Sequence, residues 1–94
     1  MYEVHAYATT ATSASPGKFP RGEKHALLLF LRQPEGAEID LAAAERFLAK
    51  EGWVSPEFQQ IGVADPNGEL ENMAELHRAA LNDGGIIIVY AELL

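Results

Sequence analysis

The sequence predicts an α+β protein, a two-layer sandwich in which a four-stranded mixed sheet carries two helices on one face. Four segments with alternating or continuous apolar residues predict strands, and two segments with apolar residues at helical spacing predict helices. Their order along the chain is ββαβαβ. Because 94 residues leave room for a single core, we expect one domain that spans residues 1–94.

Residues 2–8 are expected to form the first strand, where small or apolar residues alternate with Glu3, His5 and Tyr7. A strand with one wetter face belongs near an edge of the sheet. Residues 9–24 follow as a flexible loop, because two prolines and two glycines exclude regular structure from its second part. A loop of this length in so small a domain is typical of a functional segment.

The second strand is expected at residues 25–32, with apolar side chains on both faces. One face would carry Leu27, Leu29 and Leu31, and the other Leu28 and Phe30. After a break at residues 33–36, Asp40 is the expected N-cap of the first helix. This helix should run to about Glu51 and stop at Gly52.

A weaker strand is expected at about residues 58–64, followed by a turn at residues 65–68. The second helix should run over about residues 69–82, and the last strand over residues 84–91. Because crossover connections are right-handed, both helices should pack on the same face of the sheet. The layering is loosely ferredoxin-like, although the element order is not the βαββαβ of that architecture.

The apolar character of two strands conflicts with this two-layer arrangement. The second and last strands are apolar on both faces, whereas two helices on one face would leave the other uncovered. Something else must then cover the second face: another copy of the chain, a partner, or a ligand cavity. We therefore expect a homodimer formed through the sheet face.

The net charge of −7 is unevenly placed along the chain. Residues 1–39 are neutral overall, whereas residues 40–94 carry ten acidic side chains against three basic ones. This surface disfavours nucleic-acid binding; it suits a basic partner protein or simply reflects solubility. The apolar runs are too short to span a membrane, and no signal-peptide layout is present, so we expect no membrane association and a cytoplasmic protein.

Three side chains are candidates for ligand binding. His77 lies on the apolar arc of the second helix, while His5 and Tyr7 share a face of the first strand and could line a pocket. The alternatives are a satisfied buried imidazole for His77 and a solvated strand edge for the other two. His25, at the start of its strand, is expected to face solvent. The three histidines lack metal-ligand spacing and the chain has no cysteine, so we expect no metal site.

The loop offers a second candidate site. Lys18, Arg21 and Lys24 gather there around Phe19, which suits contact with an anion or a partner, although a solvated hairpin loop would look the same. The Gly17-to-Lys24 spacing only approaches a phosphate-binding loop, since a Glu intervenes, no hydroxyl follows the lysine, and a strand follows instead of a helix.

No segment carries a catalytic signature, and no cofactor motif is present, so we expect no catalytic residue and no cofactor. The favoured function is a non-catalytic protein-interaction or regulatory module that acts as a homodimer and possesses a protein partner. The alternative is a dimeric α+β barrel-like protein or enzyme that binds a small molecule in a cavity between its sheets.

Overall fold

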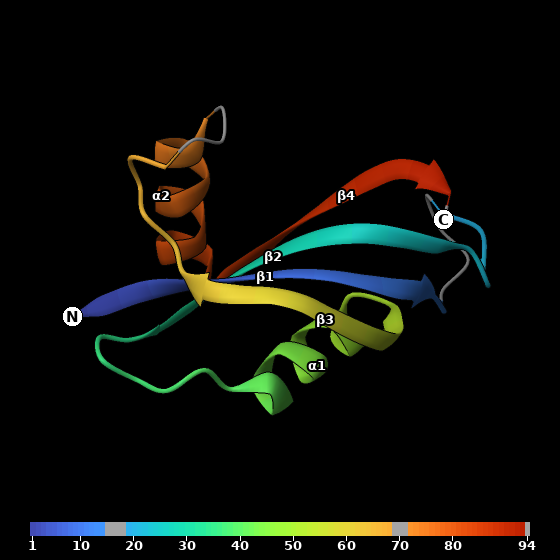
Figure 1. Ribbon diagram of the computed structural model, residues 1–94, viewed down its shortest axis with the longest axis horizontal. Coiled ribbons are helices and arrows are strands. Elements are labelled where there is room, and N and C mark those ends of the chain that lie inside the picture. The colour runs from blue at the N-terminus through green and yellow to red at the C-terminus, as the bar shows by residue number, and fades with distance from the viewer. Residues whose placement is uncertain (15–18, 69–71, 94) are drawn as a thin grey trace.

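The computed structural model describes residues 1–14, 19–68 and 72–93. Its six elements follow the expected order ββαβαβ (Figure 1). The strands are β1 (Tyr2–Ser13), β2 (Lys24–Pro34), β3 (Trp53–Val63) and β4 (Gly85–Leu93). They form one sheet in the order β3-β1-β2-β4, and every neighbouring pair is antiparallel. The expectation of a mixed sheet is therefore wrong: strands that run parallel, such as β2 and β3, are separated by a third strand.

The first two strands form a long hairpin with Tyr7 opposite Leu29. β1 continues to Ser13, whose N–H donates to the Glu23 carbonyl at 2.8 Å, while the Gly22 N–H donates back to the Ser13 carbonyl at 2.8 Å. The expected loop over residues 9–24 therefore begins too early, because residues 9–13 belong to β1. The small and hydroxyl residues Thr9, Thr10, Ala11 and Ser13 are instead buried in a central strand of the sheet.

Helix α1 (Leu41–Lys50) begins at the expected N-cap, where the Asp40 carboxylate accepts a hydrogen bond from the Ala43 N–H at 3.0 Å. The helix buries Ala44 and Leu48 against one face of the sheet. We call this the α1 face. Its buried cluster is formed by Tyr7, Ala11, Leu27, Leu29, Leu31, Ala44, Leu48 and Trp53.

Helix α2 (Met73–Asp83) ends at Gly84, which takes the left-handed conformation common after helices. Its first expected residues, 69–71, lie outside the described part of the chain. The helix packs against the opposite face of the sheet, here called the α2 face. The buried cluster on this side is formed by Val4, Phe30, Ala64, Met73 and Ala80.

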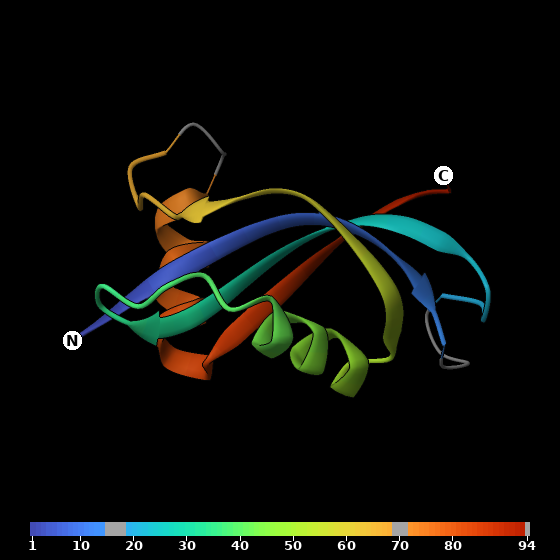
Figure 2. The same cartoon turned by 60° about the horizontal axis from the view of Figure 1, so that its bottom comes forward.

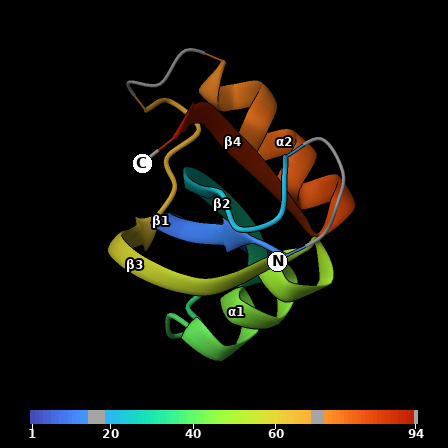
Figure 3. The ribbon, with the colours of Figure 1, turned by 90° about the vertical axis from the view of Figure 1, so that its right-hand side faces the viewer.

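The helices therefore lie on opposite faces, which corrects the expectation that both cover one face (Figures 1 and 2). The view along the sheet shows α1 on one side of the strands and α2 on the other (Figure 3). The crossover rule applies to parallel strands. Only α1 joins a parallel pair, β2 and β3, whereas α2 joins the antiparallel strands β3 and β4 at opposite edges of the sheet. The result has three layers, helix–sheet–helix, and its strand order is not ferredoxin-like.

β1 lies in the middle of the sheet, not near an edge as its alternating pattern suggested. Its expected wet face lies beneath α1 and is buried: neither His5 nor Tyr7 retains solvent exposure. The pattern misleads because a histidine and a tyrosine can be buried when each gains a hydrogen bond, here from His5 Nε2 to Glu3 and from the Tyr7 hydroxyl to the Asp40 carbonyl.

Candidate functional site

Among the described residues, helix α2 covers only the end of its face that lies away from the β1–β2 hairpin, and the end nearer the hairpin is open (Figure 1). Gln60, Ala8, Leu28 and Ile88 lie opposite one another across the four strands, and Tyr90 follows on β4. The Tyr90 side chain is 47% exposed, and Leu28 and Ile88 are only partly buried. We call the area formed by Ala8, Ala26, Leu28, Gln60, Ile88 and Tyr90 the open half of the α2 face.

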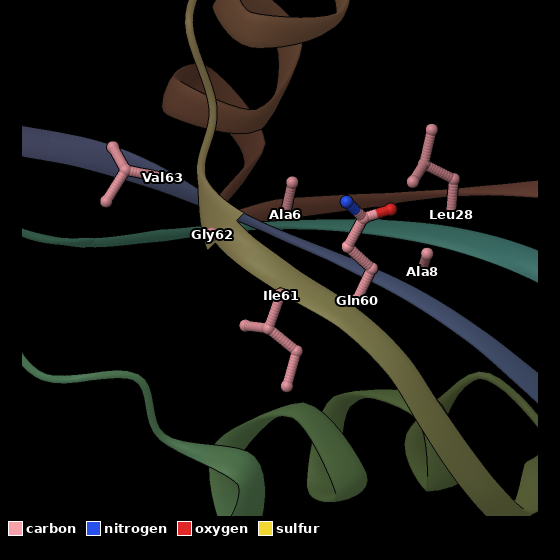
Figure 4. Close-up of a pocket in the computed structure, with 7 residues that line it drawn as sticks. All are labelled: Ala6, Ala8, Leu28, Gln60, Ile61, Gly62 and Val63. Atoms are coloured by element: carbon pink, nitrogen blue, oxygen red, sulfur yellow. The ribbon is translucent and has the colours of Figure 1, made fainter.

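A hollow of about 240 Å³ lies on this surface beside β3. Its lining is formed by Ala6, Ala8, Leu28, Gln60, Ile61, Gly62 and Val63 (Figure 4). In the close-up, the Leu28 and Gln60 side chains stand on the same side of the sheet as α2, and Ile61 points toward α1. The alanines leave the space because their side chains are too short to fill it.

Charged side chains border the open half, where Glu57 lies opposite Thr10, the strand partner of Ala26. Lys24 and Glu57, on β2 and β3, form an ion pair at 3.5 Å between Nζ and Oε1. None of the residues that define the open half carries a charge. The surface is therefore neutral at its centre in a protein whose net charge is −7.

The predicted ligand residue His5 is paired with its strand neighbour Glu3. The His5 Nε2 donates to Glu3 Oε2 at 2.6 Å, and the other Glu3 oxygen accepts from the Gly36 N–H at 3.1 Å. The hydrogen bond from His5 is the largest cause that lowers the pKa of Glu3, with the Gly36 amide second. Within the described residues the buried His5 Nδ1 has no hydrogen-bond partner.

Tyr7 lies beneath α1, where its hydroxyl donates a long hydrogen bond of 3.4 Å to the Asp40 carbonyl. Burial raises the pKa of the Tyr7 hydroxyl above its usual value. His77 belongs to α2, on the other side of the sheet, and is partly buried. The structure therefore brings His5 and Tyr7 onto one face and keeps His77 apart from them.

Two of the three cations of the predicted loop site, Arg21 and Lys24, are engaged locally. Arg21 Nε donates to the Ala14 carbonyl at 3.0 Å, and Lys24 belongs to β2 and pairs with Glu57. Lys18 lies outside the described residues. A role of these side chains in anion or partner contact stays a prediction.

His25 is buried, which corrects the expectation that it faces solvent. Its Nδ1 lies 2.8 Å from the Tyr90 carbonyl and its Nε2 lies 3.1 Å from Glu23 Oε1, so the protonated imidazole donates to both oxygens. The hydrogen bond to Glu23 is the largest cause that raises the pKa of His25. The rings of Phe19 and Trp53 pack against the imidazole, with centroids at 4.7 and 5.9 Å. This cluster closes the hairpin end of the sheet.

Over residues 1–14, 19–68 and 72–93, no group of three potential metal ligands comes together. In the same part of the chain, neither helix has the length and apolar character needed to cross a membrane. Comparison with protein family models, with curated proteins and with solved structures finds no match to this chain.

The sequence predicted contact through an uncovered sheet face, but no residue of the open half of the α2 face was among its candidate site residues. The alternation of residues 86, 88 and 90 against 87 and 89 does separate two faces of β4. That pattern says nothing about which face a helix will cover, or how much of it. The short length of α2 and its place at one end of the sheet decide this.

Proposed function

We propose that this protein is a non-catalytic interaction module that acts as a homodimer joined through the open half of the α2 face. The observation that carries the proposal is the row Ala8, Leu28 and Ile88 across three neighbouring strands, next to the half-exposed Tyr90. Contiguous apolar surface of this kind typically marks an interaction site.

The charge distribution favours a second copy as the occupant. A two-fold axis places the same patch against itself, so a charged centre would repel its own image. The centre here is neutral, and the rim pair Lys24 and Glu57 offers both signs to the other copy. A strongly basic partner would find no carboxylate at the centre of this surface.

The size of the surface sets the expected strength. Strands lie about 4.8 Å apart and rise about 3.3 Å per residue, so four strands over about six residues give a flat area of roughly 400 Å². A standard interface buries about 800 Å² on each partner. We therefore expect a reversible dimer with a dissociation constant in the micromolar range or above.

The test is the molar mass in solution, measured by light scattering or sedimentation over a concentration series. Ala8→Glu adds a charge to an inner strand where the hollow leaves room for the side chain, and Tyr90→Glu adds one at an exposed position. Both variants should stay folded and monomeric. The control is Leu41→Glu, a residue of similar exposure, 44%, on α1. A wild-type monomer at millimolar concentration, or dissociation caused equally by the control, would refute the proposal.

A second candidate function follows from the hollow of about 240 Å³. Two copies that meet through the open half would enclose this space between their sheets, as the dimeric cavity alternative requires. Its lining includes Gln60 as a polar group and does not include His5, Tyr7 or His77. A small-molecule screen by thermal shift, repeated with Gln60→Ala, tests this candidate; hits that the variant leaves unchanged would exclude the hollow as their site.

A further inference from the structure

We propose that the outer edge of β4 is a docking site for an extended segment of another protein, which adds a fifth strand to the sheet. The segment is antiparallel to β4, apolar at alternate positions, and acidic at its C-terminal end. This surface is distinct from the open half of the α2 face, and the proposal does not depend on the dimer.

The two edges of the sheet are built differently. β3 carries Pro56 and Glu57, and its pairing with β1 has two register shifts. Proline, charge and bulges are the usual devices that keep an edge strand from pairing with another chain. β4 has neither proline nor charge over residues 85–91, and its pairing with β2 is regular over residues 85–89, with a register shift only after Val89. Such an edge is a template for strand addition.

A groove beside this edge can receive side chains. α1 packs mainly against β3, the strand at the opposite edge of the sheet, and leaves space next to β4. A hollow of about 290 Å³ lies between Phe47 of α1 and residues Gly85 and Ile87 of β4. Alternate side chains of an added strand point to one face of the sheet. The side chains of the added strand that point to the α1 side would enter this hollow. Because Phe47 and Ile87 line it, these side chains should be apolar.

The positive charges near the start of β4 indicate that the added segment is acidic at its C-terminal end. A second hollow, of about 300 Å³, adjoins the first at Phe47 and is lined by Arg46, Lys50 and Gly84. Arg46 and Lys50 lie one helical turn apart, and no carboxylate of the described residues forms an ion pair with either. In an antiparallel arrangement the C-terminal end of the added segment lies beside Gly85. A carboxylate at this end of the segment would lie near both cations. Glu51 lines the neighbouring hollow and would repel a carboxylate farther along, so only the C-terminal end of the segment should be acidic.

The probe is a synthetic peptide that alternates threonine and valine and ends on two aspartates. We expect binding with a dissociation constant on the order of 0.1 mM in dilute salt, read from the fluorescence anisotropy of a dye attached to the N-terminus of the peptide. Two N-methylated peptides serve as controls. One carries methyl groups on the amides of its odd-numbered residues and the other on the amides of its even-numbered residues. A strand uses the amides of one edge only, so one control should bind like the parent and the other about ten-fold more weakly or not at all. Equal affinity of all three peptides would overturn strand addition.

The acidic end is tested with the double variant Arg46→Glu and Lys50→Glu, both on the exposed side of α1. This variant should bind the peptide at least five-fold more weakly, and added salt should reduce the difference. The control, Arg78→Glu on α2, makes one such charge reversal away from the groove and should bind like the wild type. No binding tighter than about 10 mM, or an equal loss in the control, would overturn the proposal. So would protection of the outward-pointing β4 amides that rises with protein concentration in Tyr90→Glu without peptide, since this variant lacks the dimer through the open half and a second copy would then occupy the edge.

Discussion

The placement of the helices on opposite faces makes a quantitative prediction for paired substitutions. Leu48 of α1 and Leu29 of β2 belong to one buried cluster, whereas Phe30, the next residue along β2, belongs to the other. Leu48→Ala should destabilise the fold by about 3 kcal/mol, Leu29→Val by about 1 kcal/mol and Phe30→Leu by about 1.5 kcal/mol. A domain of this size has about 5 to 14 kcal/mol of stability, so each double variant should still fold.

The coupling free energy between the substitutions distinguishes the two arrangements. Residues of one packed cluster show coupling of about 0.5 to 3 kcal/mol, whereas separated sites add to within about 0.5 kcal/mol. Urea denaturation of the four proteins in each cycle measures this quantity. We expect Leu48 to couple with Leu29 and to be additive with Phe30. Coupling with Phe30 and additivity with Leu29 would show that α1 covers the other face, and the described layering would be wrong.

Two further substitutions test local contacts. Asp40→Ala removes the N-cap of α1 and should cost about 1 kcal/mol, or about 4 to 8 °C in Tm, whereas Glu38→Ala, two residues earlier, should leave the thermal melt unchanged. Glu23→Gln removes the carboxylate that raises the pKa of His25. A raised pKa means that the Glu23 contact stabilises the fold below about pH 6.5, the usual pKa of histidine, and that this contribution is lost as the pH rises through the folded-state pKa. The Tm difference between wild type and Glu23→Gln should therefore be largest near pH 6 and vanish at alkaline pH; a difference independent of pH would contradict this assignment.

The local patterns of the sequence determined the number, type and order of the elements. The Asp40 cap, the glycine after each helix and the continuous apolar run of β4 act over a few residues, so they can be read directly from the chain. The apolar character of both faces of β2 and β4 indicated that each face needs cover. The expectation that something other than a helix covers the second face was wrong for the part that lies under α2.

Only the tertiary structure decided how that cover is provided. β2, α1 and β3 form a crossover between parallel strands, but α2 joins antiparallel strands at opposite edges, and no local pattern specifies that pairing. The same pairing makes β1 central and buries His5 and Tyr7, although its alternation indicated a wet edge. Strand pairing depends on contacts between residues far apart in sequence. It therefore determined both the open half of the α2 face and the unprotected edge of β4, the two surfaces to which we assign binding.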